Sequence, residues 1–244
     1  MNPVRTILRR ELASYFATPL AYVFVTIFLF FLNLLAFFLG RIYEVEQSDL
    51  RPFFLLHPWL YLILVPAISM RFWPEERASG SIELLLTQPI TMWQAVLGKF
   101  LAGWLFIGFA LTLTLPLWFT IIWLGSPDNG VIVAAYIGSL FMAGAYLAVG
   151  SFMSVLTRSQ VIAFILAFVV CFLLVMSGFP MVLDWFRDWA WPWVTEGIAA
   201  LSFYTHFENI TKGVLDLRDV LYFALVILFF LVASAVALDS RKSQ

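Results

Sequence analysis

Six long apolar runs with almost no charge inside them constrain this chain more than any other feature. They cover residues 20–39, 54–72, 100–124, 131–156, 161–183 and 220–238. A helix needs about 20 apolar residues to cross the roughly 30 Å hydrocarbon core of a bilayer. The runs are continuous, whereas the strands of a membrane barrel alternate between apolar and polar residues. The sequence therefore predicts an all-α polytopic membrane protein with six transmembrane helices, forming a single transmembrane domain over 1–244.

Composition excludes several classes of protein. Residues of the AVILMFWYC set make up 63% of the chain and charged residues 12%, against about 25% charged in soluble domains. Too little polar surface is present to cover a water-soluble enzyme. The net charge of −1 gives no reason to expect a nucleic-acid partner, and the single cysteine, Cys171, excludes disulfides within the chain.

The basic residues predict the orientation. With six spans both termini lie on one side, and that side carries nine of the 14 Lys and Arg residues, against five on the other. The positive-inside rule then places both termini in the cytoplasm. The first apolar run is too long for a signal-peptide core and lacks a small-residue cleavage site, so we expect it to stay in the membrane as a span.

Residues 3–16 predict an N-terminal helix lying in the inner interface, with an apolar arc and with Arg5, Arg9 and Arg10 near lipid phosphates. Glu11 falls inside the apolar arc at 100° per residue. Two readings remain open: the carboxylate reaches the interface by itself, or it pairs with a cation on a neighbouring element.

The cytoplasmic stretch 73–99 is the second segment outside the spans. Residues 82–86 predict a short helix that Pro89 ends, and Thr91-x-x-Gln94 is typical of a capping box that opens a helix running through Lys99. An ordinary connection needs only a few residues. The helix signals therefore favour a docking role over a plain loop.

The outer segment 184–219 holds four of the ten tryptophans within nine residues. Indole rings prefer the headgroup level, which favours an interfacial belt over a sugar- or lipid-binding cluster. Gly178-Phe179-Pro180 would let the fifth span break before this segment. The fourth span carries small residues from Gly138 to Ser154, and these leave open whether they pack within the chain or against another subunit.

Signals for catalysis are weak. His57 and His206 are both predicted at the outer interface, with no further histidine or cysteine to complete a metal site. No ionisable side chain lies in the central part of a span, which argues against a proton- or sodium-driven carrier. Leu97-Gly98-Lys99-Phe100 lacks the leading glycine and the hydroxyl of a phosphate-binding loop. We therefore predict no catalytic residue and no metal ligand, and any ATP would be hydrolysed by a separate chain.

Four passages resemble the permease subunit of type-2 ABC transporters, most closely the gliding-motility (GldF-like) branch. Arg10–Tyr22 is similar to the elbow helix of that family. Glu75–Ile90, followed by Leu97–Phe100, resembles its signature cytoplasmic loop. Leu201–Phe207, with Gly213 and Asp216, resembles its last outer loop, and six spans with cytoplasmic termini complete the likeness.

The resemblance implies a function, a location and partners. Two permeases, identical or paralogous, would form a pore in a bacterial inner membrane with two ABC ATPase subunits below them. ATP and Mg²⁺ would bind to the ATPase and no cofactor would bind to this chain. A coupling helix within 82–98 would dock on the ATPase. By position, Glu11 would lie near Arg71–Arg77, and a pair with Arg77 is our hypothesis. The residues implied for ATPase coupling are Glu75, Glu76, Arg77, Glu83, Leu84, Leu85, Gln88, Pro89, Thr91 and Gln94, with Arg9, Arg10 and Glu11 in the elbow.

Two other functions stay open from the sequence. The chain would be a membrane scaffold or assembly protein that transports nothing, or an intramembrane enzyme that uses His57 or His206. The sequence does not select a substrate, although nearly uncharged spans suit a lipid, a hydrophobic molecule or mechanical signalling.

Overall fold

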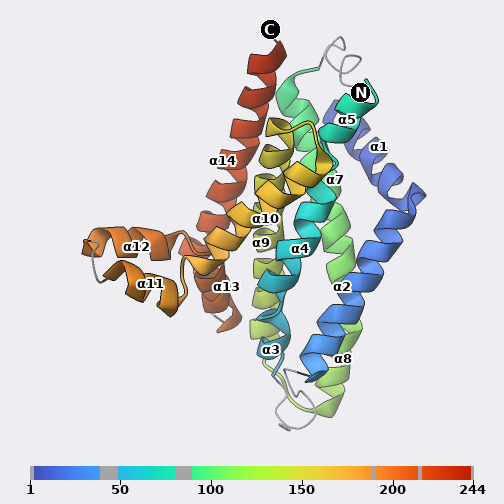
Figure 1. Cartoon of the computed structure of the whole chain (residues 1–244). Coiled ribbons are helices and arrows are strands. Elements are labelled where there is room, and N and C mark those ends of the chain that lie inside the picture. The colour runs from blue at the N-terminus through green and yellow to red at the C-terminus, as the bar shows by residue number, and fades with distance from the viewer. Residues whose placement is uncertain (1–2, 39–48, 81–89, 188–190, 214–215, 243–244) are drawn as a thin grey trace.

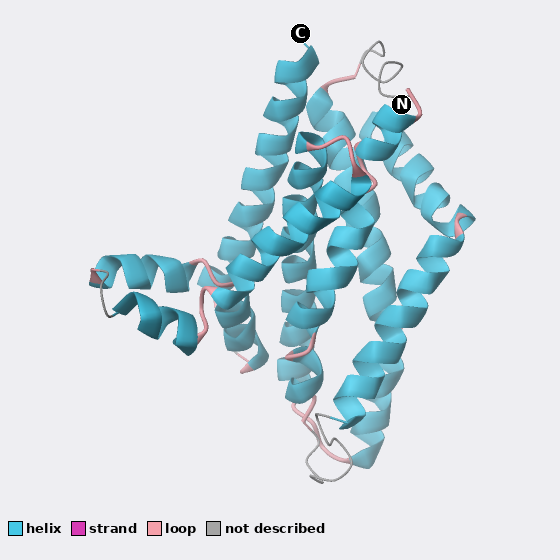
Figure 2. Ribbon diagram, in the orientation of Figure 1, coloured by secondary structure: helices cyan, strands magenta, loops and turns pink. Residues whose placement is uncertain are grey.

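The computed structural model describes residues 3–38, 49–80, 90–187, 191–213 and 216–242, and every regular element in these ranges is a helix (Figures 1 and 2). In chain order the helices are α1 Pro3–Ala17, α2 Pro19–Phe38, α3 Arg51–Phe54, α4 His57–Ser69, α5 Pro74–Ala78, α7 Met92–Thr112, α8 Leu115–Leu124, α9 Asn129–Leu156, α10 Gln160–Met176, α11 Pro180–Arg187, α12 Pro192–Ala200, α13 Phe203–Thr211 and α14 Leu217–Lys242.

Among the described residues, five helical stretches are long and apolar enough to cross a membrane, and there are six if the bent pair α10–α11 is one span. The five are Ala21–Phe38, Arg51–Ala78, Met92–Trp123, Asn129–Leu156 and Leu217–Ser240. The prediction of an all-α multi-pass membrane protein is therefore confirmed. The start of α1 and the end of α14 lie at the same end of the bundle, as an even number of crossings requires (Figure 1).

The fifth apolar run is shorter as a straight helix than the predicted 161–183. α10 ends at Met176, and α11 leaves it at 80°. Two causes lie at the break. Pro180 has no backbone N–H to continue the helix. Gly178 lies so close to α13 that a Cβ there would stand 2.3 Å from Ser202 Oγ. The break thus lies where α13 packs against the end of α10.

α9 forms the centre of the bundle. Its small residues allow close approach by other helices of the same chain: a Cβ on Gly138 would lie 2.8 Å from Ile210, one on Gly144 would lie 2.9 Å from Ile227, and Gly150 packs directly against Ser69. Helices α4, α7, α10, α13 and α14 all contact α9. The small face is thus used for packing inside the subunit, which resolves the alternative left open by the sequence.

The outer segment divides into a projecting part and a packed part. α11 and α12 contact each other and extend sideways from the bundle (Figure 1), and Trp185 is 63% and Trp191 73% exposed. α13 instead packs into the bundle through buried Phe203 and Phe207. Exposed indole rings suit an interfacial belt, which stays a prediction.

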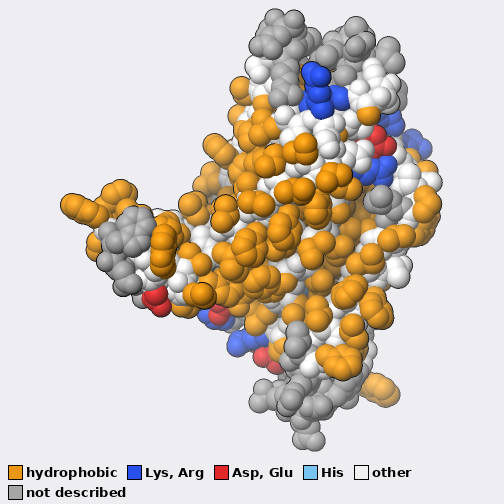
Figure 3. All heavy atoms as spheres, viewed as in Figure 1, with side chains coloured by type: hydrophobic (Ala, Val, Ile, Leu, Met, Phe, Trp, Pro, Cys, Tyr) orange, Lys and Arg blue, Asp and Glu red, His pale blue; other side chains and the backbone are white. Residues whose placement is uncertain are grey.

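On the face shown in Figure 3, hydrophobic side chains cover the middle of the bundle, and Lys, Arg, Asp and Glu gather toward its two ends. One of these charged groups, near the end that holds α1 and α5, has three of its four side chains largely buried. It forms the candidate site.

Candidate coupling site

The site begins with a close contact between α1 and α7. Ile7 is the buried residue of α1, and a Cβ on Gly98 of α7 would lie 2.8 Å from Ile7 Cγ2. Glycine at 98 therefore lets the two helices approach. Residues four apart share one face of a helix, so Glu11 also faces α7, where Lys99 follows Gly98. Glu11 lies in the apolar arc of α1 because that arc packs on α7.

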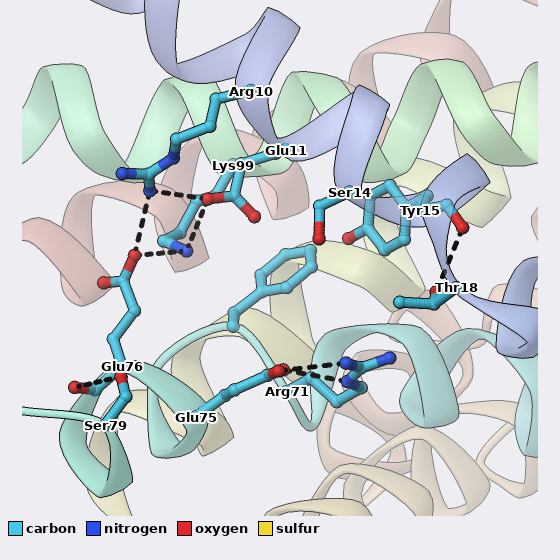
Figure 4. Close-up of a pocket in the computed structure, with 11 residues that line it drawn as sticks. Arg10, Glu11, Ser14, Tyr15, Thr18, Arg71, Glu75, Glu76, Ser79 and Lys99 are labelled. Carbon is cyan, nitrogen blue, oxygen red and sulfur yellow. Dashed lines mark hydrogen bonds and ion pairs between the residues drawn. The ribbon is translucent and has the colours of Figure 1, made fainter. Parts of the chain in front are cut away.

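Four side chains from three helices form a closed ionic cluster, which we call the Lys99 cluster: Arg10 and Glu11 of α1, Glu76 of α5 and Lys99 of α7 (Figure 4). Lys99 Nζ lies 3.1 Å from Glu11 Oε1 and 2.9 Å from Glu76 Oε1. Arg10 Nη2 lies 2.7 Å and 3.1 Å from the same two oxygens. Two cations thus share two anions, and the cluster is neutral.

Burial makes the cluster depend on this balance. The Lys99 side chain is 3% exposed, Glu76 12% and Glu11 18%, whereas Arg10 is 58% exposed and closes the cluster on its solvent side. Lys99 Nζ also lies 5.5 Å from the centre of the buried Trp73 ring, a cation–π contact. A charge removed from water in this way must be paired, because isolated burial costs several kcal/mol.

The pKa values of the α1 residues follow from the same contacts. Burial alone would raise the pKa of Glu11, but the charge of Lys99 and the hydrogen bond from Arg10 outweigh it, so the pKa falls below 4.5. The hydrogen bond to Glu11 raises the pKa of Arg10 in turn. Glu11 and Arg10 therefore both stay charged at neutral pH. The ion pair of Glu11 with Lys99 connects α1 to α7.

The neighbourhood expected for Glu11 is confirmed, but its cation is not the expected one. Glu11 lines a cavity of about 320 Å³ together with Arg71, Glu75 and Glu76. Its partners are Lys99 and Arg10, whereas Arg71 pairs with Glu75 at 2.9 Å. Lys99 was predicted as part of the helix that opens at Thr91 and of the Leu97–Phe100 passage, but not as the partner of Glu11. Gly98 was the available signal, because a glycine in a helix permits the close approach that α1 makes here.

Arg77 has a separate role. Its Nη1 donates to the carbonyl of Thr157 at 2.6 Å, and its Nη2 donates to the carbonyl of Val155 at 2.8 Å. The last carbonyls of a helix have no partner inside it, so the guanidinium caps the C-terminus of α9. Arg77 thereby connects α5 to the central helix of the bundle, rather than pairing with Glu11.

Some of the remaining predicted site residues lie within the described ranges, and others lie outside them. The capping box is confirmed: Thr91 Oγ1 accepts from Gln94 N at 3.3 Å, and Gln94 Oε1 accepts from Thr91 N at 3.1 Å. Arg9 is exposed on α1. The short helix α5 was not predicted from the sequence. The predicted helix 82–86, with Glu83, Leu84, Leu85, Gln88 and Pro89, lies outside the described residues.

Both histidines hold helices together. His57, fully buried at the start of α4, lies with Nδ1 3.2 Å from the carbonyls of Phe53 and Phe54. His206 of α13 lies with Nδ1 2.5 Å from Asp219 Oδ1 of α14 and with Nε2 3.0 Å from the carbonyl of Ala200. Each thus has a structural role. Within the described ranges no three His, Cys, Asp or Glu residues are grouped to hold a metal ion.

Comparison with known proteins gives one finding. The family model described as "ABC-2 family transporter protein" matches residues 44–243, which is most of the chain and includes α5, α7 and every later helix. No curated protein matched. In this family the permease lacks an ATPase domain and works with an ABC ATPase in a separate subunit. The chain therefore belongs to the ABC-2 family, as a multi-pass permease subunit.

Proposed function

We propose that this chain is the permease of a bacterial ATP-driven exporter or mechanotransmitter, and that its segment 73–99 transmits movement from the ATPase to the membrane helices. It would lie in the inner membrane with both termini in the cytoplasm, paired with a second permease, with lipid around it and with ATP and Mg²⁺ bound on the ATPase. Within the family we assign the chain to the gliding-motility (GldF-like) branch. The likeness of its cytoplasmic loop to the loop of that branch supports this assignment.

The observation that carries the proposal is the Lys99 cluster together with Arg77. Three helices meet in the cluster, and α5 of the coupling segment supplies one of its two shared carboxylates. Arg77, one residue after Glu76, caps α9. A displacement of the segment by the ATPase would therefore act on α1, α7 and α9 together. Such differential contact is what can shift a two-state membrane element.

Charge distribution supports the proposed orientation. The end of the bundle that holds α1 and α5 also holds the start of α7, the α9–α10 connection and the end of α14 (Figure 1). Eight of the 14 basic residues belong to these segments, and Arg71, between α4 and α5, is the ninth on this side. The positive-inside rule favours the cytoplasm for that end, which is the side on which an ATPase is found.

Co-purification tests the docking role. An affinity-tagged chain is expected to retain its ATPase in detergent, and the double substitution Leu84→Ala with Leu85→Ala is expected to lower the recovered ATPase at least tenfold. Met181→Ala is the matched control, because Met181 is an exposed apolar residue of the projecting α11. Equal recovery from both variants would refute docking through this segment. A wild-type chain that retains no ATPase would favour the scaffold function instead.

Transmission is tested separately from docking. Arg77→Lys keeps the positive charge, but a single ammonium does not reproduce the two-pronged contact of a guanidinium with two carbonyls. The variant is expected to bind ATPase as well as the wild type does, yet to lose most of the effect of the permease on the rate of ATP hydrolysis. A normal rate would show that α9 does not receive movement through Arg77.

A further inference from the structure

Asn33 places a half-buried carboxamide inside the apolar span of α2, at the edge of a face that the other described helices leave uncovered. Thr26 and Phe30 on this face are exposed, and a shallow hollow lies between them, Leu29, Leu34 and Asn33. The other Asn and Gln residues in candidate spans stand in the first turn of their helices: Gln94, Asn129 and Gln160. Asn33 therefore differs from them in its depth.

The side chain of Asn33 points away from the nearer end of its helix. Nδ2 donates to the carbonyl of Leu29 at 2.7 Å, one turn back toward the start of α2, so the amide is directed toward the middle of the span. A carboxamide has a second N–H and an acceptor oxygen. In the described part of the chain no other hydrogen bond reaches them. Lipid tails offer no partner for either group.

Other uncovered faces make no such demand. The face of α14 around Leu225, Phe229 and Val232 is purely apolar, and lipid tails solvate such side chains as well as another helix does. The exposed hydroxyls of Thr112 and Thr120 donate to carbonyls of their own helices. Unmet hydrogen-bonding capacity at depth thus distinguishes the face of α2.

We propose that a second copy of this chain packs against this face of α2, with Asn33 contacting Asn33 of the second copy across a two-fold axis. This rests on the proposed function, which requires two permeases, and assigns their contact. A carboxamide is both donor and acceptor, so two of them satisfy each other, as an interface between identical patches requires. Phe30 and Phe37 are exposed one turn before and after Asn33 and supply apolar area on either side of it.

Cysteine cross-linking in native membranes tests the contact, with the full chain and its ATPase co-expressed. Cys171, which is buried, is first replaced by Ala. Single cysteines at Phe30 and Phe37 are then expected to form disulfide-linked dimers on mild oxidation. The matched controls Leu32→Cys and Ala36→Cys lie on the buried side of the same helix and are expected not to link. Val232→Cys tests whether two copies contact each other through the exposed face of α14 instead.

Asn33→Leu tests the amide itself. Interhelical hydrogen bonds in membranes contribute roughly 0.6–2 kcal/mol, so the dimer dissociation constant in lipid is expected to rise about 3- to 30-fold. Asn33→Gln keeps the amide and is expected to weaken the dimer less.

Three results would overturn the proposal: dimers that link only at Val232, equal dimer stability in Asn33→Leu and wild type, or a complex with a different permease as second subunit. These leave the proposed function intact. A complex with one permease would overturn both.

Discussion

Replacing Lys99 with Met removes the central cation of the Lys99 cluster without removing its side-chain volume. Two carboxylates then share Arg10 alone, and the cluster carries a net charge of −1. Taking one partner from a buried ion pair costs about 3–5 kcal/mol. Arg10 still lies 2.7 Å from Glu11 and 3.1 Å from Glu76, so we expect the lower end, about 3 kcal/mol. For chains of this size that corresponds to a fall in melting temperature of about 6–12 °C.

Tryptophan fluorescence during heating of the purified protein measures this shift. Lys212→Met is the matched control, because Lys212 also pairs with a glutamate at 3.1 Å, but with its side chain 55% exposed. Exposed pairs contribute about 0–1 kcal/mol, so its melting temperature is expected to change little.

Restoring neutrality provides the stronger test. Adding Glu76→Gln to Lys99→Met leaves Arg10 and Glu11 as a balanced pair, so the double variant is expected to regain at least half of the lost melting temperature. Independent sites would instead add their losses. Equal shifts for Lys99→Met and Lys212→Met, or a double variant less stable than the single, would refute the reasoning.

Three further variants test other parts of the structure. Gly150→Ala is expected to destabilise the protein by about 1–3 kcal/mol, because its Cβ would overlap Ser69; Gly197→Ala, with nothing within 4 Å, should not lower the melting temperature. Asp219→Asn weakens a buried contact with His206 and should cost about 1.5–3 kcal/mol, measured as faster protease cleavage of the outer segment. Glu11→Gln should lower the melting temperature at pH 7. The native pKa of Glu11 lies below its usual 4.5. The stability that its carboxylate contributes is therefore present above pH 4.5 and is lost as pH falls through the native pKa. A difference in melting temperature between variant and wild type that persists in acid would contradict this pairing.

Features that depend on residues close together in the sequence were predicted correctly. The spans follow from apolar runs, and the capping box at Thr91 follows from residues three apart, so both could be read from the sequence. The break after Met176 was predicted less well, because the end of α10 depends on how closely α13 packs on Gly178. The pairing of Glu11 was the hardest to predict. Glu11 and Lys99 are 88 positions apart and meet only because α1 packs on α7. The sequence also contains several other cations that could have paired with Glu11.

Glu11 also shows what a violated pattern can mean. An acid in an apolar arc breaks the rule by which the rest of α1 is built, and such local conflicts are found where a structure meets a functional demand. If α1 only had to cover α7, an apolar residue at position 11 would do so without the cost of burying a charge. That apolar residue would leave the buried Lys99 with one anion fewer, and Lys99 is also held by Glu76 of segment 73–99. The acid at position 11 is therefore explained by the charge that it meets on α7, and through Lys99 it connects α1 to the segment for which we propose a coupling role.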